Sequence, residues 1–178
     1  MLLLHTCCAP CSAAIIEWLL GNGIRPTLFY YNPNIFPSKE YEIRKAECTR
    51  YAQLQGIEII DGDYQHGDWL KNVAGLETEP ERGVRCLQCF KMRMLATAKL
   101  ASERELSRFA TTLASSRWKS LEQIADAGYW AAAQFENVQF WEKNWRKDGL
   151  SERRRELLKE CDFYNQQYCG CEFSMRKG

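Results

Sequence analysis

The sequence predicts an α/β protein in which helices flank a parallel sheet. Short apolar runs typical of buried strands alternate with longer stretches of helical pattern, and the connections between them are short. The clearest unit comes first, as a strand over residues 2–6, a helix over 12–20 and a strand over 27–31. A strand, a helix and a strand joined in this way form a right-handed parallel crossover, so we expect a parallel sheet.

Local sequence signals predict where the helices and the other strands begin and end. Ser12 is a plausible N-cap of the first helix, and Gly21-Asn22-Gly23 ends it. We expect a second helix over residues 39–55, a third strand over 57–61, a long helix from Arg85 to about residue 105, a fourth strand over 108–113 and a helix over 120–127. Residues 64–70 are predicted to be irregular and 75–83 to form a loop.

The rest of the chain is less regular, with one helix expected over about residues 151–161. The length suits a single domain over residues 1–178, with an α/β core over 1–128 and a helical C-terminal part over 129–178. The net charge of +1 does not indicate a general nucleic-acid binder. The apolar runs are too short to span a membrane, and Met1 leads into a strand without a signal sequence, so we expect a cytoplasmic protein with no membrane partner.

Nine cysteines are the unusual feature of the composition. In a reducing compartment a high and odd number of cysteines indicates metal binding or redox catalysis rather than a disulfide scaffold. Seven of them form three groups: Cys7, Cys8 and Cys11; Cys86 and Cys89; and Cys169 and Cys171. Cys48 lies within a helical pattern and Cys161 near a helix end, so packing is the expected role of both.

The first group occupies the turn between the first strand and the first helix. Ligands of open α/β sheets bind outside the carboxyl ends of the strands, where this turn lies. The helix dipole and free N–H groups stabilise thiolates there, so we interpret Cys7, Cys8 and Cys11 as metal or redox residues. A glycine-rich phosphate loop, such as that of ATP-using proteins of this architecture, is missing from this turn, which disfavours nucleotide hydrolysis.

Cys86 and Cys89 form a C-x-x-C pair at the start of the long helix and can supply two thiolate ligands. Together with Cys7 and Cys8 they make a four-thiolate set suited to structural zinc or to a 4Fe–4S cluster. Adjacent cysteines fit the tetrahedral geometry of zinc less readily than separated knuckles do. We therefore favour iron–sulfur over zinc.

The third group, Cys169-Gly170-Cys171, is a C-x-C pair. A disulfide closed over one residue is strained, and Gly170 eases the strain because it tolerates unusual dihedral angles. Such a bond is easily reduced, so we interpret the pair as redox-active, with two reduced thiols in a tail as the alternative. Of the two histidines, His5 is expected to be a hydrogen-bonded core group, and the sequence assigns no role to His66.

These motifs together resemble the epoxyqueuosine reductase QueH family. The matching stretches are His5-x-Cys7-Cys8-Ala9-Pro10-Cys11, Tyr31-Asn32-Pro33-Asn34-Ile35 with Pro37, Glu40-Tyr41-x-x-Arg44, Arg85-Cys86-x-x-Cys89-x-x-x-Arg93, Thr111-Thr112-Leu113-x-x-Ser116 with Lys119, and Tyr168-Cys169-Gly170-Cys171-x-x-Ser174. They extend over nearly the whole chain, and only the segment around residues 140–144 departs from the family pattern.

The resemblance implies a Rossmann-like fold of the adenine nucleotide alpha hydrolase-like type. It implies a cobalamin-independent enzyme that reduces epoxyqueuosine to queuosine at the wobble position of tRNA, the last step of queuosine biosynthesis. The implied site residues are Cys7, Cys8, Cys86 and Cys89 as ligands of a 4Fe–4S cluster, Cys169 and Cys171 as a redox-active pair, and Cys11 as a ligand of a second mononuclear metal ion, iron or zinc. The implied partners are tRNA carrying epoxyqueuosine and an unidentified electron donor.

Two other functions stay open at this point. A zinc-stabilised RNA-binding module would use the thiols without catalysis, and a thiol–disulfide oxidoreductase would need only Cys169 and Cys171. Basic side chains considered for contacts with tRNA phosphates are Arg44, Lys45, Arg85, Lys91, Arg93, Arg146, Arg153, Arg154 and Arg155. Candidate proton donors are Asp61, Asp63 and Tyr31.

Overall fold

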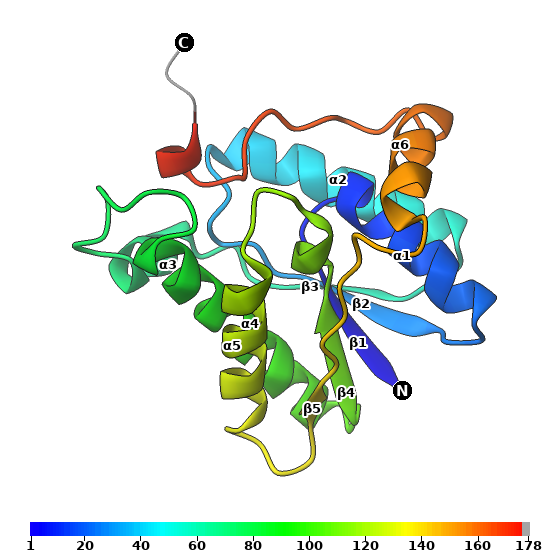
Figure 1. Cartoon of the computed structure of the whole chain (residues 1–178), viewed down its shortest axis with the longest axis horizontal. Coiled ribbons are helices and arrows are strands. Elements are labelled where there is room, and N and C mark those ends of the chain that lie inside the picture. Colours follow the sequence, from blue (N-terminus) through cyan, green and yellow to red (C-terminus); the bar gives the residue numbers. More distant parts are fainter. Residues whose placement is uncertain (176–178) are drawn as a thin grey trace.

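A five-stranded parallel sheet forms the centre of the molecule, with helices on both faces (Figure 1). The computed structural model describes residues 1–175. The strands are β1 (Leu2–Thr6), β2 (Pro26–Tyr30), β3 (Ile59–Asp61), β4 (Arg108–Thr111) and β5 (Gln139–Phe140), in the order β3-β2-β1-β4-β5. Every neighbouring pair is parallel. The predicted α/β class and Rossmann-like architecture are confirmed.

The helices form two layers (Figure 1). One layer contains α1 (Ala9–Gly21), α2 (Ser38–Leu54) and α6 (Leu150–Glu160), and the other contains α4 (Val84–Glu103) and α5 (Leu121–Ala132). The short α3 (His66–Asn72) contacts α4, and 3-10 turns cover Thr112–Ser115 and Glu172–Ser174. Among the described helices, none combines the length and the apolar character needed to cross a membrane.

The strand order reverses at β1, and this reversal creates the crevice of the fold. The chain passes outward from β1 through β2 to β3 and then returns to place β4 on the other side of β1. Ligands of open sheets bind at such a reversal, outside the carboxyl ends of the strands. The register pairs His5 with Thr111, and the amide of Cys7 donates a hydrogen bond to Thr112 Oγ1 at 3.3 Å. The first cysteines therefore lie in the crevice.

The core explains why β1 was readily predicted. Leu2, Leu3 and Leu4 are buried because helices cover both faces of the sheet at its central strand. A strand that is buried on both faces has a continuous apolar sequence instead of an alternating one. The apolar residues of α1, including Ile15, Ile16 and Leu19, pack into the same core.

The first helix begins three residues earlier than predicted. Cys8 has an extended backbone and is the N-cap, and Pro10 lies in the first turn, where its missing N–H is harmless. Ser12 is therefore inside the helix, and its hydroxyl donates to the carbonyl oxygen of Cys8 at 2.7 Å. The prediction of Ser12 as the N-cap is wrong, and the earlier start places Cys11 on the first turn beside Cys7.

Other elements also differ from the prediction, and three of the differences bear on the architecture. Residues 66–72, within and just beyond a segment expected to be irregular, form α3. The fourth strand ends at Thr111, because the chain then turns into the 3-10 helix over Thr112–Ser115. The short strand β5 was not anticipated, and it adds part of the C-terminal region to the sheet edge.

Candidate functional site

Three cysteines meet in the crevice at the end of β1. The Sγ atoms of Cys7, Cys8 and Cys11 all lie within 4.8 Å of one another, and all three residues are buried. Cys7 and Cys8 follow the strand, and Cys11 comes from the first turn of α1, so one short segment supplies the whole group. Over residues 1–175 no other set of three or more His, Cys, Asp or Glu side chains has this spacing.

Hydrogen bonding differentiates the three thiols. Hydrogen bonding with Cys11 and Cys8 lowers the pKa of the Cys7 thiol well below its usual value. Burial raises the pKa of Cys8, and the hydrogen bond with Cys7 raises the pKa of Cys11. Three neighbouring cysteine sulfurs are a soft ligand set, which suits a thiophilic metal.

His5 is not available as a further ligand. Its Nδ1 lies 2.9 Å from Thr111 Oγ1, and its Nε2 lies 2.9 Å from the carbonyl oxygen of Tyr31. Burial, together with the charge of Arg93, lowers the pKa of His5 to about 3, so its ring is neutral. The predicted role of His5 as a hydrogen-bonded core group is confirmed.

Three cysteines of the second and third groups line a common pocket. Cys86 lies on the first turn of α4 and lines this pocket together with Cys169, Cys171 and Lys119. Cys89, one turn later, is buried in a small apolar cluster that also contains Cys171. The fold thus brings together the C-x-x-C pair and the C-x-C pair, which are far apart in the sequence.

A buried arginine connects Cys89 with the end of β1. Arg93 Nη1 lies 3.9 Å from Cys89 Sγ, and Arg93 Nη2 donates to Asn32 Oδ1 at 2.5 Å. The Asn32 amide in turn donates to the carbonyl oxygen of Thr6 at 2.9 Å, one residue before Cys7. This series of contacts sets the start of α4 against the crevice that holds the first cysteine group.

The four predicted cluster ligands do not form one compact group in the structure. Cys7 and Cys8 have Cys11 as their third neighbour, and Cys86 and Cys89 lie outside that set. The remaining cysteines pack as the sequence indicated. Cys48 is buried in the core, and Cys161 is partly buried against it.

The chemistry of the donors fits a thiophilic metal centre. Every group that the three sets offer is a thiol, and Cys7, Cys8 and Cys89 are at most 7% exposed. Soft thiolates in a shielded pocket suit zinc and iron–sulfur clusters. Arg93 and Lys119 add positive charge, since both act on the ionisation of Cys7.

Lys119 is a residue whose role the sequence did not reveal. It is 6% exposed and lines the pocket with Cys86 and Cys169. Burial alone would lower the pKa of its ammonium, but the negative charge that Cys169 and Cys7 bear when ionised outweighs this effect, and the pKa is raised. Lys119 belongs to the stretches that resemble the family, yet a lysine in a loop gives no sign in the sequence that it is buried.

Three arginines considered for phosphate contacts are internal structural residues. Arg44, Arg85 and Arg93 are at most 3% exposed, and each donates hydrogen bonds within the protein. Their side chains turn inward, so the structure gives no support to surface phosphate contacts by these three. The candidate proton donors Asp61, Asp63 and Tyr31 line a different groove, beside β3 and α4.

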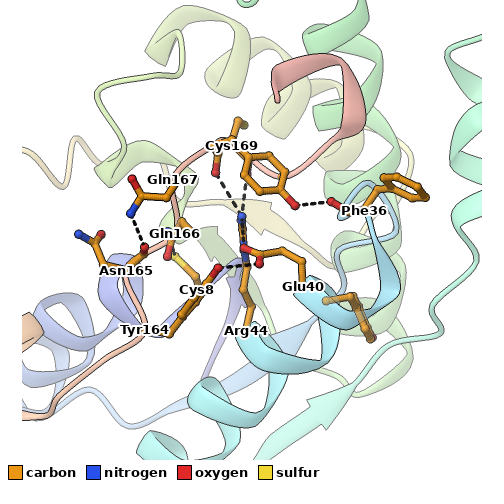
Figure 2. Close-up of polar contacts among 12 residues, drawn as sticks. Cys8, Phe36, Glu40, Arg44, Tyr164, Asn165, Gln166, Gln167 and Cys169 are labelled. Carbon is orange, nitrogen blue, oxygen red and sulfur yellow. Dashed lines mark hydrogen bonds and ion pairs between the residues drawn. The ribbon is translucent and has the colours of Figure 1, made fainter. Parts of the chain in front are cut away.

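The C-terminal segment over residues 163–174, which we call the strap, carries the third cysteine group. Figure 2 shows the strap bonded to residues of α2 and of the loop that precedes it. Its Gln166 Nε2 also donates to Cys8 Sγ at 2.8 Å. The strap therefore contacts the first cysteine group while it presents Cys169 and Cys171 to the pocket.

Known proteins with this fold and sequence place the chain in a family. The family model described as "Epoxyqueuosine reductase QueH" matches residues 2–177. A solved structure titled as a predicted subunit of tRNA methyltransferase, from Methanocaldococcus jannaschii, has a TM-score of 0.52 at 16% identity and covers 94% of each chain. At this identity it shows the fold alone.

Three curated relatives carry the same description. The Epoxyqueuosine reductases QueH of Acinetobacter baylyi and Haemophilus influenzae are each 47% identical over 175 residues, which is 98% of this chain and 80% and 71% of theirs. The Thermotoga maritima protein is 33% identical over 176 residues, 97% of this chain and 89% of its own. The chain therefore belongs to the epoxyqueuosine reductase QueH family.

Proposed function

We propose that this chain reduces the epoxide of epoxyqueuosine in tRNA, at the wobble position, to give queuosine without cobalamin. Family membership supports the activity. The observation that carries the chemistry is the gathering of three cysteine groups around one crevice and its adjoining pocket. The reaction would take place in the cytoplasm and would draw on an unidentified electron donor.

Cys7, Cys8, Cys86 and Cys89 are the proposed ligands of a 4Fe–4S cluster. The burial of Cys7, Cys8 and Cys89, and the contacts of Arg93 that join α4 to the end of β1, support this assignment. When bound, such a cluster would supply electrons one at a time. Cys11 remains as a ligand for a second metal ion, iron or zinc.

The thiols of the strap can supply the electrons and protons that the reduction consumes. Converting an epoxide to an alkene takes two electrons and two protons and releases one water. The dithiol of Cys169 and Cys171 gives up two electrons and two protons as it becomes a disulfide, and the external donor must then reduce it. Burial raises the pKa of Cys171 to about 11, so this thiol carries its proton at neutral pH.

Lys119 is the proposed partner of the epoxide oxygen. Its buried ammonium lies in the same pocket as Cys86 and Cys169. As a C–O bond breaks, the oxygen gains negative charge, and a fixed cationic donor stabilises that charge more strongly in a shielded pocket than in water. Lys119 would therefore hold the leaving oxygen while a thiol proton is transferred to it.

The test is the conversion of epoxyqueuosine in tRNA by anaerobically reconstituted protein with a chemical reductant, followed by mass spectrometry of the nucleosides. Cys86→Ala is expected to lose the activity completely. Cys161→Ala is the matched control and should keep it, because Cys161 packs at the edge of the core. A thiol–disulfide oxidoreductase working through Cys169 and Cys171 alone would stay active in Cys86→Ala.

Iron and zinc analysis with a visible absorption spectrum completes the test. The reductase proposal expects a coloured protein that contains iron. A colourless, zinc-loaded protein that converts no epoxyqueuosine would contradict it and would support a zinc-stabilised RNA-binding module.

A further inference from the structure

The cysteines of the strap need to be held in place from outside. Cys169 and Cys171 lie between α6 and the last 3-10 turn, outside the helices and strands. A segment of this kind opens locally unless other parts of the fold hold its backbone. Two of the hydrogen bonds that hold it come from one side chain of α2, Arg44 (Figure 2).

Arg44 bonds directly to the backbone at the first cysteine of the pair. Its Nη1 donates to the carbonyl oxygen of Cys169 at 3.1 Å, and its Nη2 donates to that of Tyr168 at 3.2 Å. Its guanidinium also lies over the Tyr168 ring, 5.2 Å from the ring centre. The residue is 3% exposed, so these contacts form where water competes little.

A carboxylate fixes the guanidinium in this position. Arg44 Nε donates to Glu40 Oε1 at 2.8 Å, one turn earlier on α2, and the other carboxylate oxygen accepts from the hydroxyl of Tyr164 at 2.7 Å. Glu40 is buried, and Tyr164 belongs to the strap. Glu40 therefore binds the strap before its cysteines, and Arg44 binds it at Cys169. The planar guanidinium of Arg44 can bond the carboxylate and two carbonyl groups at once.

The strap also fits closely against the neighbouring loop. Gly170 has a φ of +144°, and a Cβ there would lie 3.1 Å from Asn34 Nδ2 and 3.3 Å from Arg44 Nη1. Its carbonyl oxygen accepts from the amide of Phe36 at 2.9 Å. The position of Gly170 between the two cysteines thus depends on α2, which carries Arg44, and on the loop that precedes it.

We propose that Arg44, oriented by Glu40, is the positioning residue that holds Cys169 and Cys171 at the pocket beside Cys86 and Lys119. This inference rests on the proposed function for the redox role of the two cysteines. Its geometric part, the holding of the strap, stands on the contacts of Arg44 and can be measured without any activity.

The test measures how fast N-ethylmaleimide alkylates each cysteine of the reduced, metal-free, full-length protein, with peptide mass spectrometry as the readout. In Arg44→Gln we expect alkylation of Cys169 and Cys171 to become at least about tenfold faster, because two charge-assisted hydrogen bonds to the strap are lost. Cys48, which is buried in the core, reports global unfolding and should stay protected.

Arg50 offers a matched control. It lies on α2, pairs with Glu47 and donates to the carbonyl oxygen of Cys161 at 2.9 Å, but it does not touch the cysteines of the strap. Arg50→Gln should leave the alkylation of Cys169 and Cys171 within about twofold of the wild-type rate, as expected for an exposed ion pair.

A second variant tests the proposal even if Arg44→Gln fails to fold. Arg44→Lys keeps a charge for Glu40 but has no planar fork to bond both carbonyl oxygens, so it should fold and still expose Cys169 and Cys171 selectively. Selective exposure in Arg44→Lys supports the proposal. Protection of both cysteines in both variants, or their exposure only together with Cys48, would overturn it.

Activity provides the second readout and separates the two proposals. With reconstituted enzyme, Arg44→Lys should lower kcat and leave the KM for tRNA nearly unchanged, because Arg44 is buried and does not reach the surface. If wild-type protein converts no epoxyqueuosine, the proposed function fails while the alkylation rates still decide the role of Arg44. If the wild type is active and Arg44→Lys keeps its kcat, the positioning role is wrong.

Discussion

At the scale of single residues, the burial of His5 makes the stability of the fold depend on pH. The pKa of His5 is lowered from 6.5 to about 3, first because of burial and then because of the Arg93 charge. Below pH 6.5 the unfolded chain therefore binds a proton that the folded chain does not bind. This contribution to stability is complete above pH 6.5 and is lost as the pH falls toward 3.

We expect the free energy of unfolding of the metal-free protein to fall by about 1 kcal/mol between about pH 7 and pH 5.5 on account of His5. Urea titrations at the two pH values measure it. In His5→Gln, which has no titrating ring, this part of the pH dependence should disappear. Equal pH slopes in the wild type and His5→Gln would show that His5 is not the source.

At this scale the sequence predicts which residue types take part, but not which way they point. His5, Cys48 and Cys161 take the roles that their patterns indicated. The burial of Arg44, Arg85 and Arg93 could not be predicted, because an arginine that bonds internal carbonyl groups looks the same in a sequence as one that binds phosphate. Arg44 turns inward only because Glu40 and the strap carbonyls meet it there, and that meeting is a property of the tertiary structure.

At the scale of elements, Gly128 allows α5 to pack on β5. A Cβ on Gly128 would lie 2.4 Å from Phe140 Cε1, far inside van der Waals contact. Phe140 is itself held between Phe109 and Tyr129, with ring centres 5.2 and 5.4 Å away. The ring therefore has little room to move aside.

Gly128→Ala should destabilise the protein by about 1–3 kcal/mol, the usual cost of overpacking a well-packed site. Gly21→Ala is the control: a Cβ at Gly21, the last residue of α1, meets no atom within 4 Å, and alanine in a helix is favoured over glycine, so it should not destabilise the protein. Urea unfolding curves distinguish the two. A Gly128→Ala variant as stable as the wild type would mean that β5 is not held as the structure indicates.

A helix or strand could be predicted where its own residues carry a clear local pattern. The apolar run of β1 and the long α4 have clear local patterns, and both form. The strand β5 contains only Gln139 and Phe140, and it exists because β4 offers a free edge, so nothing local could have revealed it. The N-terminus of α1 was misplaced, because a serine is a common N-cap while here the extended Cys8 takes that position.

At the scale of the whole molecule, the short strand–helix–strand connections predicted a parallel sheet. They did not predict that the cysteine groups come together. The spacing within each group was visible in the sequence. Their convergence depends on the strand order, which puts the end of β1 at the reversal, and on the strap, which returns along α2 to the same place. Neither feature has a local signature.

This architecture predicts what loss of the metal centre would do to the protein. The sheet and the main apolar core are built from β1, β2, β4 and the helices packed on them, without any cysteine pair as a bridge. Chelation of a reconstituted cluster should therefore leave a folded protein with a lower Tm, because a ligand bound only by the folded state stabilises that state.

Hydrogen exchange should then locate the change. Loss of protection is expected at the first turn of α1, at the start of α4 and along the strap over residues 163–174, the segments that carry the thiols. The amides of β1 and β2 should keep their protection, because their ladder is independent of the pocket. Complete unfolding on chelation would mean that the metal centre, and not the sheet, holds the fold together. Unchanged protection at all three segments would mean that the thiols do not share one centre.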